Sequence, residues 1–339
     1  MMPLNDFQVN INLQQPLGLV GFGKPLIVGE ITGGLAYQEF LTLEALAESV
    51  EDTSPLYQKA QALLNQENRP ERFAVAGYDS AAVDGPTTAS ALVTSLLGND
   101  WYFLITTETD VTEMTAIADV IEGSEAGGYP KLYSAQVASV DDLTTLVTEY
   151  ERSFFAVHPA DEHIDAAHIG ENGSKPVGSI TWKSKSLTGI TPQALTADEL
   201  TAIEDANGYA YVKKAGQSVT SEGKVLSGEY IDVVHGLDWV VANIENRVQK
   251  ITNQAGKIPY DDSGIAQLEA GTLSVLKEGF SQGIIADDGN GNGVYSTNFR
   301  SSAQSTAEDR KNRVYTGGNF EFQLAGAIHE GKITGSVSY

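Results

Sequence analysis

Four short apolar runs decide the fold: RFAVAGY (72–78), WYFLIT (101–106), KLYSAQV (131–137) and SFFAVHP (153–159). Segments with a helix-like spacing of apolar residues lie between and after them, near 86–98, 111–122, 141–150 and 161–169. Short buried strands that alternate with helices are typical of βαβ units. The sequence therefore predicts a mixed α/β body with a largely parallel N-terminal sheet.

The segment before this alternation predicts two short helices and one strand without a neighbour. Apolar residues recur at steps of three and four over 43–50 and 56–64, the spacing of an amphipathic helix. Residues 1–29 carry only two charges, and apolar side chains alternate near their start, which predicts a strand. The alternating residues are Phe7, Val9, Ile11 and Leu13. This strand is either an edge strand of the main sheet or an arm that pairs with another chain.

From Val177 the pattern changes to an α+β texture. GSITWKSKSL (178–187) and YAYVKK (209–214) are strand-like, and Thr196 followed by Glu199 predicts a capping box that opens a helix. Two long amphipathic helices follow, over 237–251 and about 263–280.

Residues 319–339 are again strand-like, poor in charge and rich in Gly and Ser. Their apolar residues are Phe320, Phe322, Leu324, Ile328, Ile333 and Val337. Both ends of the chain thus carry strand-forming segments without a partner nearby in the sequence.

The composition narrows the function. The 339 residues carry a formal net charge of −24, which argues against nucleic acid as a partner because phosphate binding requires clustered Lys and Arg. The absence of cysteine excludes disulfides, thiolate nucleophiles and Cys-ligated zinc. No basic segment followed by an apolar run opens the chain, and no apolar run approaches the roughly 18 residues of a spanning helix. We therefore expect neither a signal peptide nor direct membrane insertion.

GLVGFGKP (18–25) has the G-x-x-x-x-G-K spacing of a phosphate-binding loop. Such a loop needs Ser or Thr next, for Mg²⁺, and then a helix whose N-terminus faces the phosphate. Pro25 stands at that position, and LIVGEITGG after it predicts strand and turn. A glycine-rich turn is favoured over nucleotide binding.

DDGNGNG (287–293) resembles part of a calcium loop. Asp288, Asn290 and Asn292 match its first, third and fifth positions, but Phe299 replaces the bidentate Glu of the twelfth. A turn between a helix and a strand is favoured, and these three residues remain weak metal candidates.

The histidines and hydroxyl residues form no recognisable reaction centre. His158, His163 and His168 recur every five residues, so they do not share one face of a helix. No G-x-S-x-G nucleophile elbow is present. We assign no catalytic residue and no cofactor, and an enzyme is not expected.

Four stretches follow one another in a distinctive order: NGYAYVKKAG (207–216), GEYIDVVHGLDWVVANIENRVQKI (228–251), KIPYDDSGIAQLEAGTLSVLKEGF (257–280) and AEDRKNRVYTGGNFEFQLAGAIHEGKITGSVSY (307–339). From about Gly178 to Tyr339 the chain resembles the C-terminal portion of contractile phage tail sheath proteins, a family also found in phage-derived contractile injection particles. The resemblance covers somewhat under half of the chain.

The resemblance implies four parts. These are an N-terminal strand arm (1–25), a variable α/β domain (26–176), a C-terminal α+β sheath domain (177–318) and a C-terminal strand arm (319–339). In such sheaths the arms extend from the body and add strands to a small sheet in neighbouring subunits. The alternating residues of both ends, named above, are therefore the expected inter-subunit contacts.

The implied function is mechanical. Copies of the chain would form stacked hexameric rings or a six-start helix around a tail tube protein, with baseplate and tail terminator proteins at the ends. Contraction would drive the tube through the host envelope for genome ejection, without consuming nucleotide. The expected location is the virion tail, after assembly in the bacterial host cytoplasm.

Three other interpretations stay open. The first is an α/β enzyme that binds a nucleotide or sugar phosphate, which would need a glycine-rich loop between a strand and a helix. The second is another virion protein, such as a tube or capsid subunit. The third is an extracellular adhesion module stabilised by calcium at 287–293.

Overall fold

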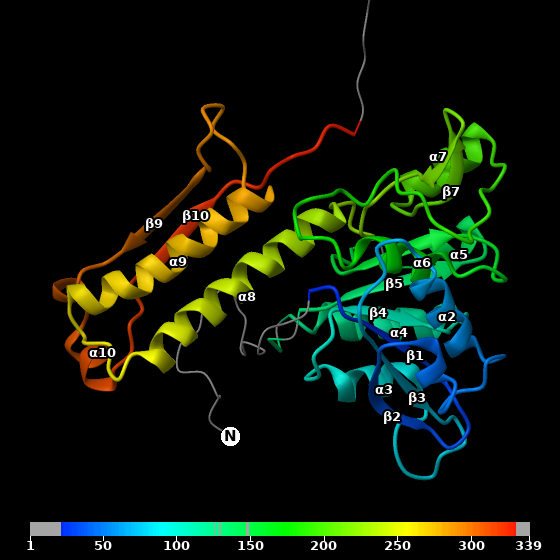
Figure 1. Cartoon of the computed structure of the whole chain (residues 1–339), viewed down its shortest axis with the longest axis horizontal. Helices are drawn as coiled ribbons and strands as arrows, with labels where there is room; N and C mark the ends of the chain where they lie inside the picture. Colours follow the sequence, from blue (N-terminus) through cyan, green and yellow to red (C-terminus); the bar gives the residue numbers. More distant parts are fainter. Residues whose placement is uncertain (1–21, 126, 129, 147–148, 330–339) are drawn as a thin grey trace, which may run out of the picture.

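A computed structural model describes residues 22–125, 127–128, 130–146 and 149–329 of the chain. The molecule has two parts, an α/β body and an elongated C-terminal lobe (Figure 1). The lobe is built on α8 (Ile231–Gln254) and α9 (Asp262–Gln282), which pack side by side and extend away from the body (Figure 1). The predicted mixed α/β fold with a largely parallel sheet is confirmed.

The body is organised around a six-stranded sheet in the order β2-β3-β1-β4-β5-β6. The strands are β1 (Pro25–Glu30), β2 (Leu35–Phe40), β3 (Phe73–Tyr78), β4 (Phe103–Thr106), β5 (Leu132–Val137) and β6 (Ser153–Val157). Neighbouring strands run parallel, except that β2 pairs with β3 in the antiparallel sense at one edge. All residues of β3, β4 and β6 are buried, as expected for a parallel sheet with both faces covered.

Helices cover both faces of this sheet. They are α1 (Leu43–Leu46), α2 (Pro55–Leu64), α3 (Ala89–Leu96), α4 (Val111–Glu122), α5 (Val140–Thr144) and α6 (Ile164–Asn172). α2 packs with α6 on one face and α3 with α4 on the other. Of the helix expected over 141–150, the described residues contain only the short α5, which ends at a C-cap on Thr145.

The rest of the chain first extends the body and then forms the lobe. Its remaining elements are α7 (Ala197–Asp205), β7 (Tyr211–Lys214), β8 (Gln217–Thr220), β9 (Tyr295–Phe299), the 3-10 helix η1 (Ser302–Gln304), α10 (Ala307–Asn312) and β10 (Gly318–Phe322). The Val157 N–H donates to the Tyr209 carbonyl at 2.9 Å, which joins the β7–β8 region to the edge of the sheet. Among the described helices, none combines the length and the apolar character needed to cross a membrane.

The strand expected over 178–187 is wrong. This segment is a series of bends around the buried side chain of Trp182, and Ser184 has a φ of 61°. The Trp182 carbonyl accepts hydrogen bonds from the His168 ring and the Thr220 hydroxyl. The Ser184 N–H and the Lys185 carbonyl pair with the backbone of Thr220, but the left-handed conformation of Ser184 interrupts the extended backbone that a strand needs.

A buried ion pair fastens α8 to the body. Arg152 Nη1 and Nη2 donate to the two carboxylate oxygens of Asp238 at 2.8 and 3.0 Å, and the Tyr102 hydroxyl donates to the same carboxylate at 2.7 Å. Burial alone would lower the pKa of Arg152, but Asp238 outweighs burial and raises that pKa, so the buried guanidinium stays charged. Tyr102 precedes β4 and Arg152 precedes β6, so α8 is fixed at the edge where these strands begin.

Replacing Asp238 by Ala should destabilise the protein strongly, because it removes the buried partner of the Arg152 guanidinium and leaves it only the partly exposed carboxylate of Glu125. We expect a loss of about 3–5 kcal/mol in the free energy of unfolding, measured by urea denaturation. The matched control is Glu278→Ala, which removes the half-exposed partner of Arg247 and should cost at most about 1 kcal/mol. Equal losses for the two variants would contradict this role of Asp238.

Candidate functional site

A small antiparallel sheet of β9 and β10 lies against α9 on the outer side of the lobe (Figure 1). Phe320 pairs with Thr297 and Phe322 with Tyr295. The Phe320 and Phe322 rings stack with centroids 6.3 Å apart and pack against the core of the lobe. Within the described residues no third strand joins β9 or β10, so each strand keeps an outer edge that can accept another strand.

The segment 319–339 was expected to have no partner nearby in the sequence, and its first residues pair with β9 of the same chain. Phe320 and Phe322 belong to β10, and Leu324 forms an isolated bridge with Ile285. The partner was missed because η1 and α10 separate β9 from β10, so the sequence carries no hairpin signal. The predicted arm residues Phe7, Val9, Ile11, Leu13, Ile333 and Val337 lie outside the described residues.

After β10 the chain continues as an extended tail that runs back toward the body (Figure 1). The Ala325 N–H donates to the Ile284 carbonyl at 2.8 Å. Ile328 then lies in solvent with 93% of its surface exposed. The ring of His329 meets the ring of Tyr230 edge to face, with centroids 4.8 Å apart. The tail therefore reaches the start of α8 before it leaves the described part of the chain.

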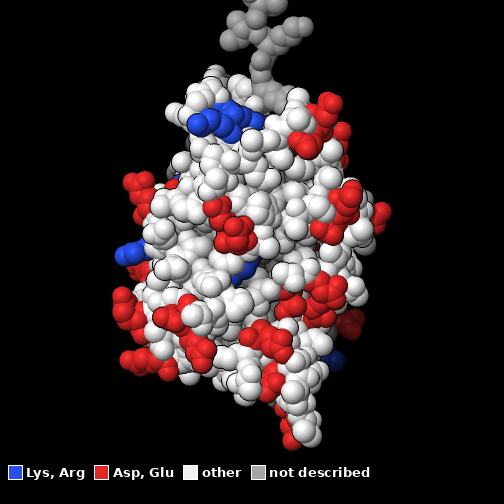
Figure 2. Space-filling view, turned by 90° about the vertical axis from the view of Figure 1, so that its right-hand side faces the viewer, with Lys and Arg blue, Asp and Glu red and all other residues white. Residues whose placement is uncertain are grey.

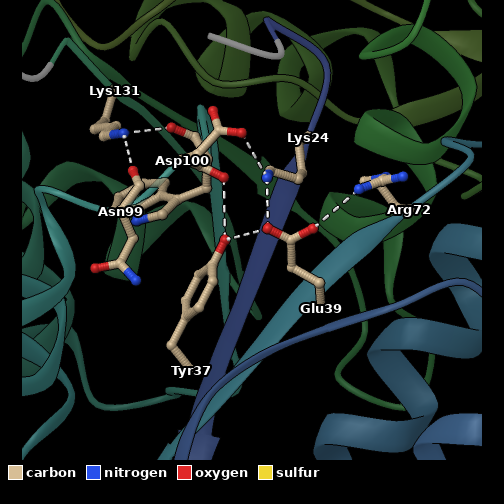
Figure 3. A network of polar contacts seen from close by, with 8 residues as sticks. Lys24, Tyr37, Glu39, Arg72, Asn99, Asp100 and Lys131 are labelled. Carbon is tan, nitrogen blue, oxygen red and sulfur yellow. Dashed lines mark hydrogen bonds and ion pairs between the residues drawn. The ribbon is translucent and has the colours of Figure 1, made fainter. Parts of the chain in front are cut away.

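At the other end of the chain, Lys24 is held by two carboxylates (Figure 3). Its Nζ donates to Glu39 and to Asp100 at 2.7 Å each, and its side chain is only 7% exposed. The hydrogen bond from Lys24 lowers the pKa of Glu39, and Arg72 approaches the other oxygen of that carboxylate. Tyr37 donates to the Asp100 carbonyl and completes the cluster.

The two residues before Lys24 are held by different segments. Gly23 lies so close to the backbone of Gly173 that a Cβ atom would be 2.4 Å from its carbonyl oxygen. The Phe22 carbonyl accepts a hydrogen bond from His235 Nε2 of α8 at 2.9 Å. His235 stacks on Tyr102 at 4.9 Å, and burial lowers the pKa of this histidine to about 4. The point where the N-terminal segment enters the body is thus fixed to both the sheet and α8.

Lys131 lies at the far end of the same cluster, buried over the ring of Trp101 (Figure 3). It donates to the Asn99 carbonyl at 3.1 Å, and burial lowers its pKa to about 7. The paired, buried Lys24 has no room for a phosphate, and β1 rather than a helix follows it. The phosphate-loop interpretation of 18–25 is therefore not supported.

The calcium-loop candidate is a tight turn. Asp287 accepts the N–H groups of Gly289 and Gly291, and Asp288 accepts those of Asn290 and Asn292. These contacts occupy the carboxylates with the turn's own backbone, as expected for Asx turns. In the described part of the chain, no group of three His, Asp or Glu side chains is placed to hold a metal.

The three regularly spaced histidines have separate structural roles. His158 bonds Glu162 and Gln193, and His163 precedes the first turn of α6. His168 Nε2 donates to the Trp182 carbonyl, and burial lowers the pKa of His168 to about 3. They do not meet at one site.

The negative charge is concentrated on the α/β body. Residues 26–176 contain 25 acidic residues (Asp and Glu) and six basic ones (Lys and Arg). Residues 177–339 contain 19 acidic and 14 basic residues. Lys59, Lys131 and Arg152 of the body are buried, which leaves its surface still more acidic. Figure 2 shows acidic side chains spread over the end of the body that faces away from the lobe.

The comparisons with known proteins agree with this geometry. Residues 231–337 match a family model described as the C-terminal domain of E217 tail sheath protein gp31-like proteins. The match begins at the first residue of α8 and includes α9, β9 and β10. The resemblance to contractile tail sheath proteins is confirmed. A search of curated proteins found no significant match.

Solved sheath proteins share the fold over most of their length. The contracted helical sheath of the anti-feeding prophage superposes with a TM-score of 0.66 at 11% identity, covering 98% of this chain and 97% of that one. The contracted PVC sheath complex of an extracellular contractile injection system gives 0.66 at 10% identity, with 97% of each chain covered. The sheath tail protein from Listeria innocua gives 0.55 at 9% identity, covering 83% and 89%. The sheath fold therefore extends through the α/β body as well.

The sequence did not indicate two features of this site. Lys24 bonds Asp100, which is 76 positions away in the sequence, and Arg152 bonds Asp238, which is 86 positions away. Periodicity reports only local structure, so such pairs are invisible to it. The available hint for Asp238 was a charged residue directly before Trp239 within the apolar stripe of the long helix.

The buried histidines predict acid sensitivity. Unfolded histidine titrates near pH 6.5, whereas burial holds the pKa of His235 at about 4, so below pH 6.5 the unfolded state binds more protons. Stability should therefore fall as the pH drops from 6.5 to 5, with His235 contributing about 1.4 kcal/mol per pH unit. His235→Gln should reduce that slope in denaturation experiments, and His163→Gln, a half-buried control, should reduce it less. An unchanged slope for His235→Gln would contradict the assignment.

Proposed function

We propose that this chain is the structural subunit of a contractile sheath. The observation that carries the proposal is the lobe of α8, α9, β9 and β10. It matches a tail sheath family model, and no third strand from the described residues joins its two-stranded sheet. The alternative of an enzyme that binds a nucleotide or sugar phosphate is not supported. Lys24, the lysine of the candidate phosphate loop, is paired with Glu39 and Asp100, and the resemblance is to structural proteins.

The subunits are joined by strand exchange between terminal arms. A strand from a neighbouring copy adds to an outer edge of the β9–β10 sheet, where backbone N–H and C=O groups provide the hydrogen bonds. Such pairing needs little from the side chains beyond an alternating pattern. Phe7, Val9, Ile11 and Leu13 supply that pattern at one end of the chain, and Ile328, Ile333 and Val337 at the other.

The polymer is a set of stacked hexameric rings or a six-start helix around a tail tube, bounded by baseplate and tail terminator proteins. Contraction exchanges one packing of rigid bodies for another of lower free energy, so no nucleotide or cofactor is required. The work drives the tube through the host envelope. The particle is assembled in the bacterial cytoplasm, and the subunit resides in its tail.

The acidic body influences how the copies pack. Like-charged bodies repel one another, so attraction between copies must come from short-range contacts of the lobe and the arms. The negative faces are then left for solvent or for positively charged surfaces, including the tube. Salt, which screens exposed charges over about 10 Å at 0.1 M, should favour assembly.

Two exposed apolar residues give a matched test of strand exchange. Ile328 in the tail and Val83 in a loop of the body are 93% and 98% exposed, so replacing either by Asp should leave the melting temperature unchanged. Ile328→Asp should prevent or greatly slow the formation of tubes seen by electron microscopy, because a charge enters the arm. Val83→Asp should assemble like the unaltered protein. Normal tubes from Ile328→Asp would contradict the assignment of this arm.

A further inference from the structure

Both ends of the described chain meet the same short piece of α8. Tyr230, which directly precedes α8, contacts His329 of the C-terminal tail. His235, on the second turn, donates to the carbonyl of Phe22 at the N-terminal end. Asp238, less than one turn further on, holds Arg152 of the sheet.

We propose that the segment from Tyr230 to Asp238 is a shared anchor for the two arms, and that it holds both of them in the free subunit and in the polymer. The proposal rests on the proposed sheath function for its role in the polymer. The contacts themselves belong to the single chain, so they can be tested without assembly.

The N-terminal side of the anchor is rigid. The Phe22 ring packs on Tyr102 at 5.1 Å, and the same Tyr102 stacks on His235 and donates to Asp238. The backbone of Gly23 packs so closely on Gly173 that a Cβ atom would not fit between them. A pull on the N-terminal arm is therefore transmitted at Phe22, two residues before Lys24, to α8 and to the start of β4.

The C-terminal side of the anchor has fewer contacts, and they are made by polar and aromatic side chains. His329 Nδ1 and Asp232 Oδ1 are both buried without a hydrogen-bond partner among the described residues. Burial raises the pKa of Asp232, and the nearby His329 opposes that shift. Lys224 lies over the Tyr230 ring that His329 contacts, with its Nζ 5.6 Å from the centre of that ring. The last described residue of the tail, His329, thus lies in a polar and partly enclosed position at the start of α8.

The arrangement has a mechanical consequence. Eight residue steps separate Tyr230 from Asp238, which is about 12 Å along a helix. Tension that enters by one arm leaves by the other through this segment, and neither the outer part of the sheet nor the far end of the lobe has to carry it. The bodies can then rotate during contraction while the roots of the two arms keep a fixed separation.

The absence of cysteine allows a direct test by paired cysteines. Tyr230→Cys combined with His329→Cys, both at partly exposed positions, would be treated with a short bis-maleimide reagent. We expect bridging within one chain in the free subunit, and bridged subunits that assemble as fast as untreated ones. Val83→Cys with His329→Cys is the control, and it should not bridge within a chain.

Two results would overturn the anchor. One is a free subunit in which the 230/329 pair bridges no better than the control. The other is a 230/329 double-cysteine variant that assembles when untreated but not after bridging, which would mean that the tail must leave Tyr230 during assembly. If the free subunit bridges but the unaltered protein forms no tubes, the anchor is supported within the chain while the proposed sheath function fails.

Discussion

The buried contact of Arg152 with Asp238 is the constraint on which the architecture depends. Without it, α8 and the lobe that it supports would meet the body through apolar packing, the hydrogen bond from His235 to the Phe22 carbonyl and the backbone bond from Ile231 to Gly223. A buried bidentate guanidinium–carboxylate pair has one good geometry. The hydrogen bond from the Tyr102 hydroxyl further restricts the position of the Asp238 carboxylate. The cost of burying two charges is best offset in that geometry, which favours one angle between body and lobe.

This fixed angle matters for a protein whose proposed work is movement. A sheath shortens by moving whole subunits relative to one another, so each subunit should be stiff and the joints should lie between copies. The structure has that division: two cores in the body, a third core in the lobe, and a small peripheral sheet that no other described strand joins. Backbone pairing suits such joints because it tolerates a change of partner angle better than interlocking side chains do.

Much of the body could be read from the sequence. The four apolar runs became β3 to β6, and the stripe from Leu237 to Ile251 became α8, because these signals are local and strongly periodic. The pairing of β10 with β9 and the non-strand path near Trp182 could not be read, since both depend on distant partners. The Lys24 cluster was hidden for the same reason: its sequence resembled a phosphate loop, and only the positions of Glu39 and Asp100 show that the ammonium group is already neutralised.

The central claim is that copies of this chain knit together through the β9–β10 sheet. A cryo-electron-microscopy reconstruction of the polymer formed by the full-length protein tests it most directly. The account predicts a tube in which the sheet of each copy gains strands from the ends of neighbouring copies. A β9–β10 sheet that gains no strand from a neighbouring copy, or chain ends that both fold into the sheet of their own subunit, would contradict it.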